Sequence, residues 1–186
     1  LLAPVEGEVE GLEGEAGRPA EARSALAGHE ARFPAASDQT APLRWYVGWR
    51  EGTASGPCPR LGNDDPDESR YWSLECRLAA GVDPAALLLA VRAEQGRASE
   101  TSALLLGLAA EIGRRQGAKE DALAEARRAF AAARDGASRS TLLRSHLDVV
   151  AERYARAAEG DGRLDEAREA RAEMARLARE RRAASR

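Results

Sequence analysis

The sequence predicts an all-α fold, and three observations lead to that prediction. Only 4% of the 186 residues are aromatic, so alanine and leucine have to fill most of the interior. Small side chains suit closely packed helices, whereas sheet cores favour Val, Ile and aromatic residues. Helix start and stop signals recur along the chain, while strand signals are almost absent. A short glycine-containing turn pattern also returns at intervals, as in chains built from repeated helical hairpins.

Two Asp-Pro pairs mark helix starts. In Asp65-Pro66 and Asp83-Pro84, the aspartate can accept a hydrogen bond from the start of the helix, and the proline takes the first helical position. Proline is tolerated there because the N–H group it lacks would have no acceptor within the helix. The helices that follow are expected to end near Gly81 and Gly96, because glycine is common just beyond a helix end. Three further helices are expected to begin after Ser99, after Ser138 or Ser140, and near Leu164.

Residues 43–49, LRWYVGW, form the one stretch rich in side chains that favour strands. A short helix and an extended linker both remain open for it, and a helix is favoured. Residues 51–65, EGTASGPCPRLGNDD, are expected to form an irregular loop because proline and glycine recur in them. Connections of this length usually have a function or are mobile.

A turn pattern of glycine, three residues, an acid and alanine occurs three times. It reads GRPAEA from Gly17 to Ala22, GAKEDA from Gly117 to Ala122 and GRLDEA from Gly162 to Ala167. A weaker copy, GVDPAA, starts at Gly81, and Gly52 lies where a further turn is expected. The mean spacing of these glycines is close to the ~34-residue period of helix-turn-helix repeats.

These turns resemble those of tetratricopeptide repeats. In that family a glycine ends the first helix of a hairpin, and an alanine five residues later lies where the two helices touch. A small residue seven positions before the glycine packs against that alanine. The resemblance places Ala110 and Ala155 in this position, facing Ala122 and Ala167. The next small position on the second helix, seven residues after the alanine, is Ala93, Ala129 or Met174 in the different copies.

The resemblance implies a right-handed helical-hairpin solenoid of about nine helices. It covers residues 1–186 as a single repeat domain, matches best over residues 100–183, and is interrupted by the irregular loop at 51–65. A compact helical bundle is the alternative. Because the chain has no initiator Met and begins within an apparent helix, we expect it to be a fragment or module of a longer protein. Its arginine- and alanine-rich composition is typical of a bacterial source.

By the same resemblance, the chain is expected to be a protein–protein interaction scaffold or adaptor that binds a peptide or partner domain in a helical-repeat groove. The matching groove positions are Glu111, Arg114, Glu152 and Arg156, which offer charge-assisted hydrogen bonds. The alternative is a regulatory or sensor module of a larger bacterial signalling protein, kinase or protease whose catalytic part lies outside this chain.

The aromatic residues around Trp45 and Trp49 admit two interpretations. Large rings anchor an alanine-rich core, and Trp and Tyr also dominate interface hot spots. Core packing is therefore the default, and a partner-binding patch that includes Trp45 and Trp49 is the functional alternative.

No pattern in the sequence indicates an enzyme. His29 and His146 belong to no metal or triad motif, and neither a nucleophile elbow nor a glycine-rich nucleotide loop occurs. We therefore expect no catalytic residues and no cofactor. A net charge of −3 argues against nucleic acid as a partner. No apolar run approaches the ~20 residues that span a bilayer. The sequence leaves the partner and the oligomeric state open.

The stretch EGDGRLDEA, residues 159–167, looks at first like a calcium-binding loop. Such a loop needs an acid at position 1 and a bidentate glutamate at position 12. With Gly162 at position 6, these two places hold Ala157 and Arg168. We therefore expect a helix turn and no metal site, with the acids serving the start of the next helix.

Cys58 and Cys76 can form a disulfide that clips the irregular loop to the following helix. Such a bridge would stabilise the chain by roughly 3 kcal/mol and would indicate an oxidising compartment. Two free thiols in a cytoplasmic protein fit the sequence equally well. The bacterial cytoplasm is favoured in that case, and the envelope or secretion if the disulfide forms.

Overall fold

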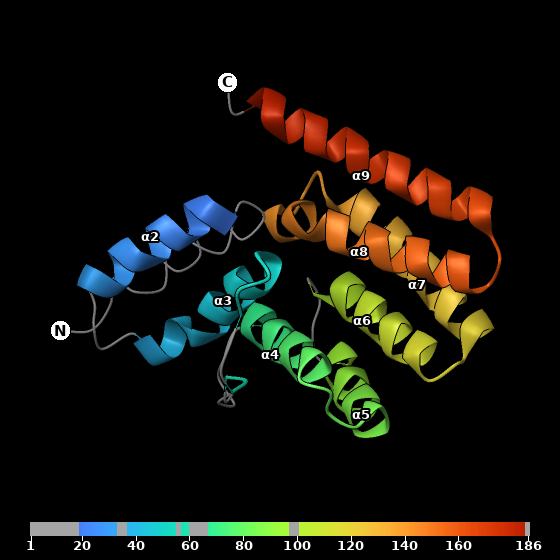
Figure 1. Cartoon of the computed structure of the whole chain (residues 1–186), viewed down its shortest axis with the longest axis horizontal. Helices are drawn as coiled ribbons and strands as arrows, with labels where there is room; N and C mark the ends of the chain where they lie inside the picture. The colour runs from blue at the N-terminus through green and yellow to red at the C-terminus, as the bar shows by residue number, and fades with distance from the viewer. Residues whose placement is uncertain (1–18, 33–36, 55–56, 60–66, 97–100, 185–186) are drawn as a thin grey trace. The chain divides into compact units, whose positions relative to one another are not determined.

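The computed structural model describes residues 19–32, 37–54, 57–59, 67–96 and 101–184. Every regular element in these ranges is an α-helix and none is a strand, so the all-α prediction is confirmed (Figure 1). The contacts divide the chain into two compact units, Leu1–Val82 and Asp83–Arg186. The sequence had suggested a single domain. In the part of the chain that the structure describes, no helix is both long and apolar enough to cross a bilayer.

Unit 1, Leu1–Val82, contains three described helices. They are α2 (Pro19–Arg32), α3 (Ser37–Arg50) and α4 (Asp67–Ala79). Helix α3 packs against both α2 and α4. The stretch LRWYVGW is helical, as favoured, because Leu43, Tyr46 and Val47 recur at helical spacing and are at most 3% exposed. Tyr46 stacks on Trp72 of α4 with a ring-centroid distance of 5.3 Å, so aromatic rings hold these two helices together.

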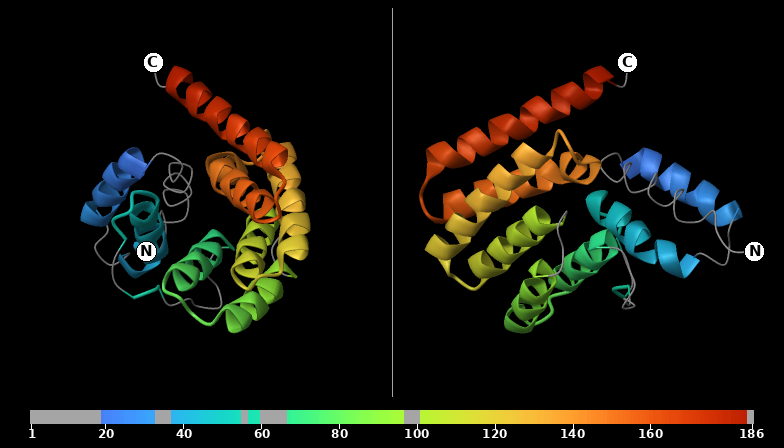
Figure 2. Two further views of the ribbon diagram at one scale, coloured as in Figure 1. Left: turned by 45° about the vertical axis from the view of Figure 1, so that its right-hand side comes forward. Right: turned by 180° about the vertical axis from the view of Figure 1, so that it is seen from behind.

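Unit 2, Asp83–Arg186, contains five described helices. They are α5 (Pro84–Gln95), α6 (Ser102–Arg115), α7 (Lys119–Gly136), α8 (Thr141–Gly160) and α9 (Leu164–Ala184). Each helix packs against the next one in the chain, and α6 also contacts α8 (Figure 2). The nine helices expected from the sequence compare with eight in the described residues of both units.

Small residues allow α6 and α7 to approach closely. A Cβ atom built on Gly107 would lie 3.7 Å from the Cβ of Ala129, and one on Gly113 would lie 3.7 Å from the Cβ of Ala122. Ala122 and Ala129 are 2% and 0% exposed. The predicted partner of Ala122 was Ala110, which is also buried, but the measured contact adds Gly113 one turn later. Glycine and alanine therefore face each other at this contact, which favours a close approach of the two helices.

Four helices end in the same way, at a glycine with a left-handed backbone conformation, which we call a glycine stop. Gly52, Gly81, Gly117 and Gly162 all have positive φ angles, between 71° and 85°. After α6, the N–H of Ala118 donates to the carbonyl of Gly113 (3.0 Å), and the N–H of Gly117 donates to that of Arg114 (3.1 Å). The other three glycines make the same two backbone hydrogen bonds, each from an N–H to a carbonyl. The pairs, donor first, are Thr53–Gly48 and Gly52–Trp49, Val82–Arg77 and Gly81–Leu78, and Arg163–Ala158 and Gly162–Glu159. This is the Schellman arrangement, which satisfies carbonyls that the helix end leaves unbonded.

The predicted turns at Gly117 and Gly162 are therefore built alike. Gly81, the weaker copy, makes the same stop, and so does Gly52, although no helix follows it directly. The first predicted copy, at Gly17, lies outside the described residues, and nothing is described of the side chain of Ala22.

The positive φ of Gly162 leads to a paired prediction. Gly162→Ala should destabilise unit 2 by about 1 kcal/mol, because a Cβ atom disfavours the left-handed conformation. Gly160 lies two residues earlier, in the last turn of α8, with no atom within 4 Å of a Cβ built there. Gly160→Ala should be neutral or slightly stabilising, because alanine favours helix. Hydrogen exchange of the α8 amides measures both, and equal effects would contradict the assignment.

Two predicted helix starts have the expected caps. The Asp83 carboxylate accepts a hydrogen bond from the N–H of Ala86 (3.0 Å), and the Ser140 hydroxyl accepts one from the N–H of Leu143 (3.3 Å). Ser140, and not Ser138, therefore caps α8. The expected starts at residues 65–66 and at Ser99 lie outside the described residues.

Candidate binding site

The predicted groove residues of α6, Glu111 and Arg114, form an ion cluster with Arg115 within their own helix. The side chain of Glu111 is 3% exposed. Its carboxylate accepts hydrogen bonds from Arg114 Nε and Nη2 and from Arg115 Nε, each at 2.9 Å. Burial raises the pKa of Glu111, but the bonds and charges of the two arginines outweigh it and hold that pKa at about 2. The carboxylate of Glu111 is therefore held by two arginines of its own helix, and its predicted role in binding stays a prediction.

The predicted groove residues of α8 also pair with each other. Arg156 Nε donates to Glu152 Oε1 at 3.0 Å, and the two side chains are 46% and 31% exposed. Partly exposed pairs four residues apart on a helix add little stability. This pairing does not test whether the α8 positions bind a ligand, so they remain predicted binding residues.

The two predicted tryptophans lie one turn apart on α3. Their rings stack with a centroid distance of 6.1 Å and an interplanar angle of 15°. Both are half-buried. Trp49 also contacts the core ring of Tyr46 at 5.4 Å, whereas Trp45 lines a pocket of unit 1. The pair therefore continues the aromatic core of unit 1 to the surface of a pocket.

This pocket, of about 890 Å³, lies between α2, α3 and the chain that follows α3. Its apolar part includes Leu26 of α2 and Val47 of α3, which are 4% and 3% exposed. Its other lining residues are Arg23, Ala41, Arg44, Trp45, Gly48, Glu51, Thr53, Ala54, Pro57, Cys58 and Pro59. All of them belong to unit 1.

The chain after α3 folds back onto Gly48. The N–H groups of Thr53 and Ala54 donate to the Gly48 carbonyl at 2.7 and 3.0 Å. A Cβ atom built on Gly48 would lie 3.3 Å from both the Cα and the N of Ala54, which is closer than most side chains tolerate. Glycine at position 48 is therefore what allows this segment to lie against α3 and form one wall of the pocket.

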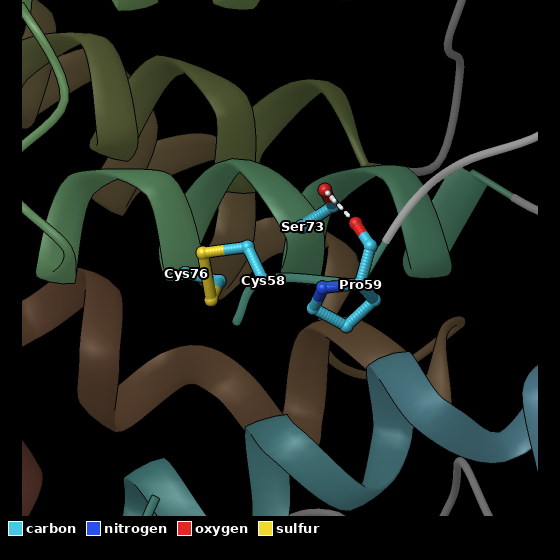
Figure 3. Close-up of a disulfide and its surroundings, with 4 residues drawn as sticks. All are labelled: Cys58, Pro59, Ser73 and Cys76. Carbon is cyan, nitrogen blue, oxygen red and sulfur yellow. Dashed lines mark hydrogen bonds between the residues drawn. A yellow bond between two sulfur atoms is a disulfide. The ribbon is translucent and has the colours of Figure 1, made fainter. Parts of the chain in front are cut away.

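A disulfide fastens the far end of the same wall. Cys58 bonds to Cys76 of α4, with the two Cα atoms 5.5 Å apart (Figure 3). Beside it, the Ser73 hydroxyl donates to the Pro59 carbonyl at 3.2 Å. Of the two states that the sequence left open for these cysteines, the structure has the disulfide.

Arginines form the polar rim of the pocket. Arg23 of α2 pairs with Glu51, and Arg44 of α3 pairs with Glu30 of α2, with its Nε 3.1 Å from Glu30 Oε1. The side chains of Arg23 and Arg44 are 60% and 48% exposed, so solvent reaches both. Each of these arginines is paired with a glutamate, so the described rim has no net charge, and what it offers a ligand is two partly exposed guanidinium groups.

Two of the four acids of EGDGRLDEA, Glu159 and Glu166, serve contacts between helices. Glu166 of α9 accepts hydrogen bonds from Arg127 Nε and Nη2 of α7 (2.8 and 2.6 Å) and from the Tyr154 hydroxyl of α8 (2.6 Å). Arg163 lies within 2.9 Å of the same carboxylate. The bonds from Arg127 and Tyr154 lower the pKa of Glu166 to about 2. Burial and the bond to Glu166 raise the pKa of Tyr154.

Two further acids of this stretch, Glu159 and Asp165, are also paired. Glu159 pairs with Arg171 of α9, and Asp165 pairs with Arg168, the residue that would have stood at position 12 of a calcium loop. Among the described residues, no group of three His, Cys, Asp or Glu side chains is placed to hold a metal ion. His29 and His146 are 1% and 0% exposed, so both are packing residues.

The sequence named Trp45 as a binding candidate but did not single out Arg23, Leu26 or Arg44. One signal was available, because Trp45 lies next to Tyr46 and so points away from the face that carries the core residues of α3. The pocket joins this ring to α2 and to the disulfide wall. The chain matches no protein-family model, no curated protein and no solved structure. The ligand of the pocket therefore has to be inferred from the residues that line it.

Proposed function

We propose that this chain is a non-enzymatic protein-interaction module that binds a peptide segment of a partner protein in the pocket of unit 1. The observation that carries this proposal is the position of Trp45, half-buried in the wall of a pocket with an apolar floor and an arginine rim. Tryptophan and arginine are the residues most enriched at interface hot spots.

The size of the pocket and the arginine side chains at its rim indicate which kinds of peptide side chain it can bind. A volume of about 890 Å³ lies within the ~300–1,000 Å³ typical of ligand pockets. It is large enough for several side chains of a peptide and far too small for a folded domain. A large apolar side chain would pack on Trp45 and Leu26. A neighbouring carboxylate would bond to Arg23 or Arg44 at the rim, because guanidinium groups bind carboxylates with two parallel hydrogen bonds.

Unit 2 has the role of a scaffold in this proposal, as a right-handed solenoid of hairpins similar to tetratricopeptide repeats. Two features support it. The stops at Gly117 and Gly162 end the first helix of each hairpin in the same way, and the first helices α6 and α8 contact each other. The disulfide of unit 1 favours an oxidising compartment, so the envelope or secretion becomes the preferred location.

Selection of random short peptides on the immobilised oxidised chain tests the binding proposal. We expect a family of peptides that combine an acid with a large apolar residue. Trp45→Ala should weaken their affinity at least about tenfold, which corresponds to 1.4 kcal/mol. The matched control is Leu89→Ala, which removes a side chain from unit 2 that is 74% exposed. Peptides that bind Trp45→Ala as well as the wild type, or no enriched family at all, would refute the proposal.

A charge substitution tests the rim separately. Arg44→Gln should weaken binding of the selected peptides by about tenfold, because it removes a charge-assisted hydrogen bond. Arg139→Gln removes an equal charge from an exposed position of unit 2 and should leave affinity unchanged. Titration calorimetry of the three proteins measures the difference, and equal losses in both variants would indicate only general electrostatic attraction.

A further inference from the structure

The two helices that meet at the pocket carry the same pattern of three residues. Each pattern has an arginine, an apolar residue three positions later and a glutamate seven positions later. The residues are Arg23, Leu26 and Glu30 in α2, and Arg44, Val47 and Glu51 in and just after α3. The N–H of Glu51 donates to the Val47 carbonyl (3.2 Å), so this glutamate continues the course of α3. Residues seven positions apart lie on one face of a helix, so the arginine and the glutamate of each pattern stand on either side of its apolar residue.

The two patterns pair with each other in opposite directions. Arg23 pairs with Glu51. Glu30 pairs with Arg44, so the start of α2 lies beside the end of α3. The two ion pairs are about 10 Å apart along the helices, because seven residues separate them and an α-helix rises ~1.5 Å per residue. The apolar residues of the two patterns lie between the pairs and are at most 4% exposed. The apolar floor of the pocket therefore has an arginine on either side.

In both ion pairs the arginine is the more exposed partner. The side chains of Arg23 and Glu51 are 60% and 18% exposed. Those of Arg44 and Glu30 are 48% and 27% exposed. Although each pair is neutral as a whole, a ligand that arrives from solvent meets its positive end first. A guanidinium has five N–H donors in a fixed plane, so it can bond to a second carboxylate while the first holds it in position.

We propose that the bound peptide carries two acidic side chains three residues apart, one for Arg23 and one for Arg44, with its large apolar residue between them. This inference rests on the proposed function, because it specifies the peptide of the same pocket. Three residues of a polyproline II chain span ~9 Å and bring a side chain back to the same face, which matches the separation of the two ion pairs. A β-strand repeats a face every second residue and offers only ~7 or ~13 Å. With an acid on each arginine, the apolar side chain between them lies over Leu26 and Trp45.

Synthetic peptides with capped ends test the spacing of the two acids. Each peptide has two glutamates in an alanine background, a leucine directly after the first glutamate, and a separation of two, three, four or five residues between the glutamates. NMR titration of the oxidised full chain measures their dissociation constants. The peptide with a separation of three should bind tightest, about tenfold tighter than those with two or five. An affinity that is independent of the separation, or highest at another separation, overturns the proposal.

Substitution of the arginines tests which groups receive the two acids. The best two-acid peptide is compared with a one-acid peptide, in which glutamine replaces one of its glutamates. The wild type should prefer the two-acid peptide about tenfold. Arg23→Gln and Arg44→Gln should each reduce this preference to less than about twofold, because one acid is enough for the single arginine that remains. A tenfold preference that persists in either variant overturns the assignment.

Arg32→Gln is the matched control, because it removes an equal charge from an exposed position of α2 outside the pocket lining. It should keep the full preference for two acids. Binding of the one-acid peptide to each variant shows that its pocket is still folded. If both peptides bind the wild type equally and Trp45→Ala abolishes their binding, the two-acid inference fails and the proposed function stands. If their binding does not depend on Trp45, the proposed function fails too.

Discussion

Ala129→Leu is expected to destabilise unit 2 by about 2–3 kcal/mol. Ala129 is 0% exposed, and a Cβ atom on Gly107 of the facing helix would already lie 3.7 Å from its methyl group. Three additional carbon atoms have no space between α6 and α7, so the helices must separate or the side chain must adopt a strained rotamer. Hydrogen exchange of the α6 and α7 amides, read by mass spectrometry, measures the loss for this unit alone.

Ala132→Leu is the matched control for this prediction. Ala132 lies on the exposed face of the same helix, so the same substitution adds carbon atoms in solvent. It should change stability by less than about 0.5 kcal/mol. Equal effects of the two variants would show that α7 tolerates a large side chain at Ala129, and the close approach of α6 and α7 would be refuted.

Glu166→Gln is expected to destabilise unit 2 by about 1–2 kcal/mol at neutral pH. The neutral amide keeps the size of the side chain but loses the negative charge of the carboxylate. That carboxylate accepts hydrogen bonds from Arg127 and from the Tyr154 hydroxyl. Hydrogen bonds to charged groups contribute more than neutral ones, and the partial exposure of Arg127, at 41%, reduces that gain. The substitution therefore weakens a contact that joins α7, α8 and α9.

The Glu166 carboxylate also predicts how the stability of unit 2 changes with pH. The pKa of Glu166 is lowered from 4.5 to about 2 in the folded chain. Its contribution is therefore fully present above pH 4.5 and is lost as pH falls toward about 2. The pKa of Glu111 is also lowered to about 2. In the Glu166→Gln variant, the free energy of unfolding should therefore still fall with pH between 4.5 and about 2, but less steeply than in the wild type. Hydrogen exchange of α9 amides, compared at neutral pH and at pH 3, measures the change.

Asp165→Asn provides the matched control, because Asp165 lies beside Glu166 in the first turn of α9 and feels the same helix dipole. Its side chain is 92% exposed, and it pairs with Arg168, which is itself exposed. Its replacement should change stability by less than about 0.5 kcal/mol. A loss equal to that of Glu166→Gln would assign the effect to the helix dipole and not to the three-helix contact.

The ion pairs of the predicted groove could have been found in the sequence. Glu111 with Arg115, and Glu152 with Arg156, are four residues apart, which is the spacing of neighbours on one helix face. The resemblance assigned Glu111, Glu152 and Arg156 to a groove, and their spacing also predicts pairs within one helix. The burial of Glu111 was not predictable in this way, because it depends on the packing around α6.

The pocket could be predicted only in part. Trp45 was identified from its residue type, but Arg23 and Glu51 are 28 positions apart, and Arg127 and Glu166 are 39 apart. No periodicity within one helix brings such residues together. The two states of Cys58 and Cys76 were equally compatible with the sequence for the same reason, since a disulfide requires two Cα atoms at the distance found here, 5.5 Å.

The sequence by itself determined where helices begin and end. The caps at Asp83 and Ser140 and the stops at Gly117 and Gly162 depend on hydrogen bonds between residues at most five positions apart. Such bonds form whenever the local residues allow them. Only the tertiary structure decided the pocket, the disulfide and the contact at Glu166, because each needs side chains from different helices at distances set by packing in three dimensions.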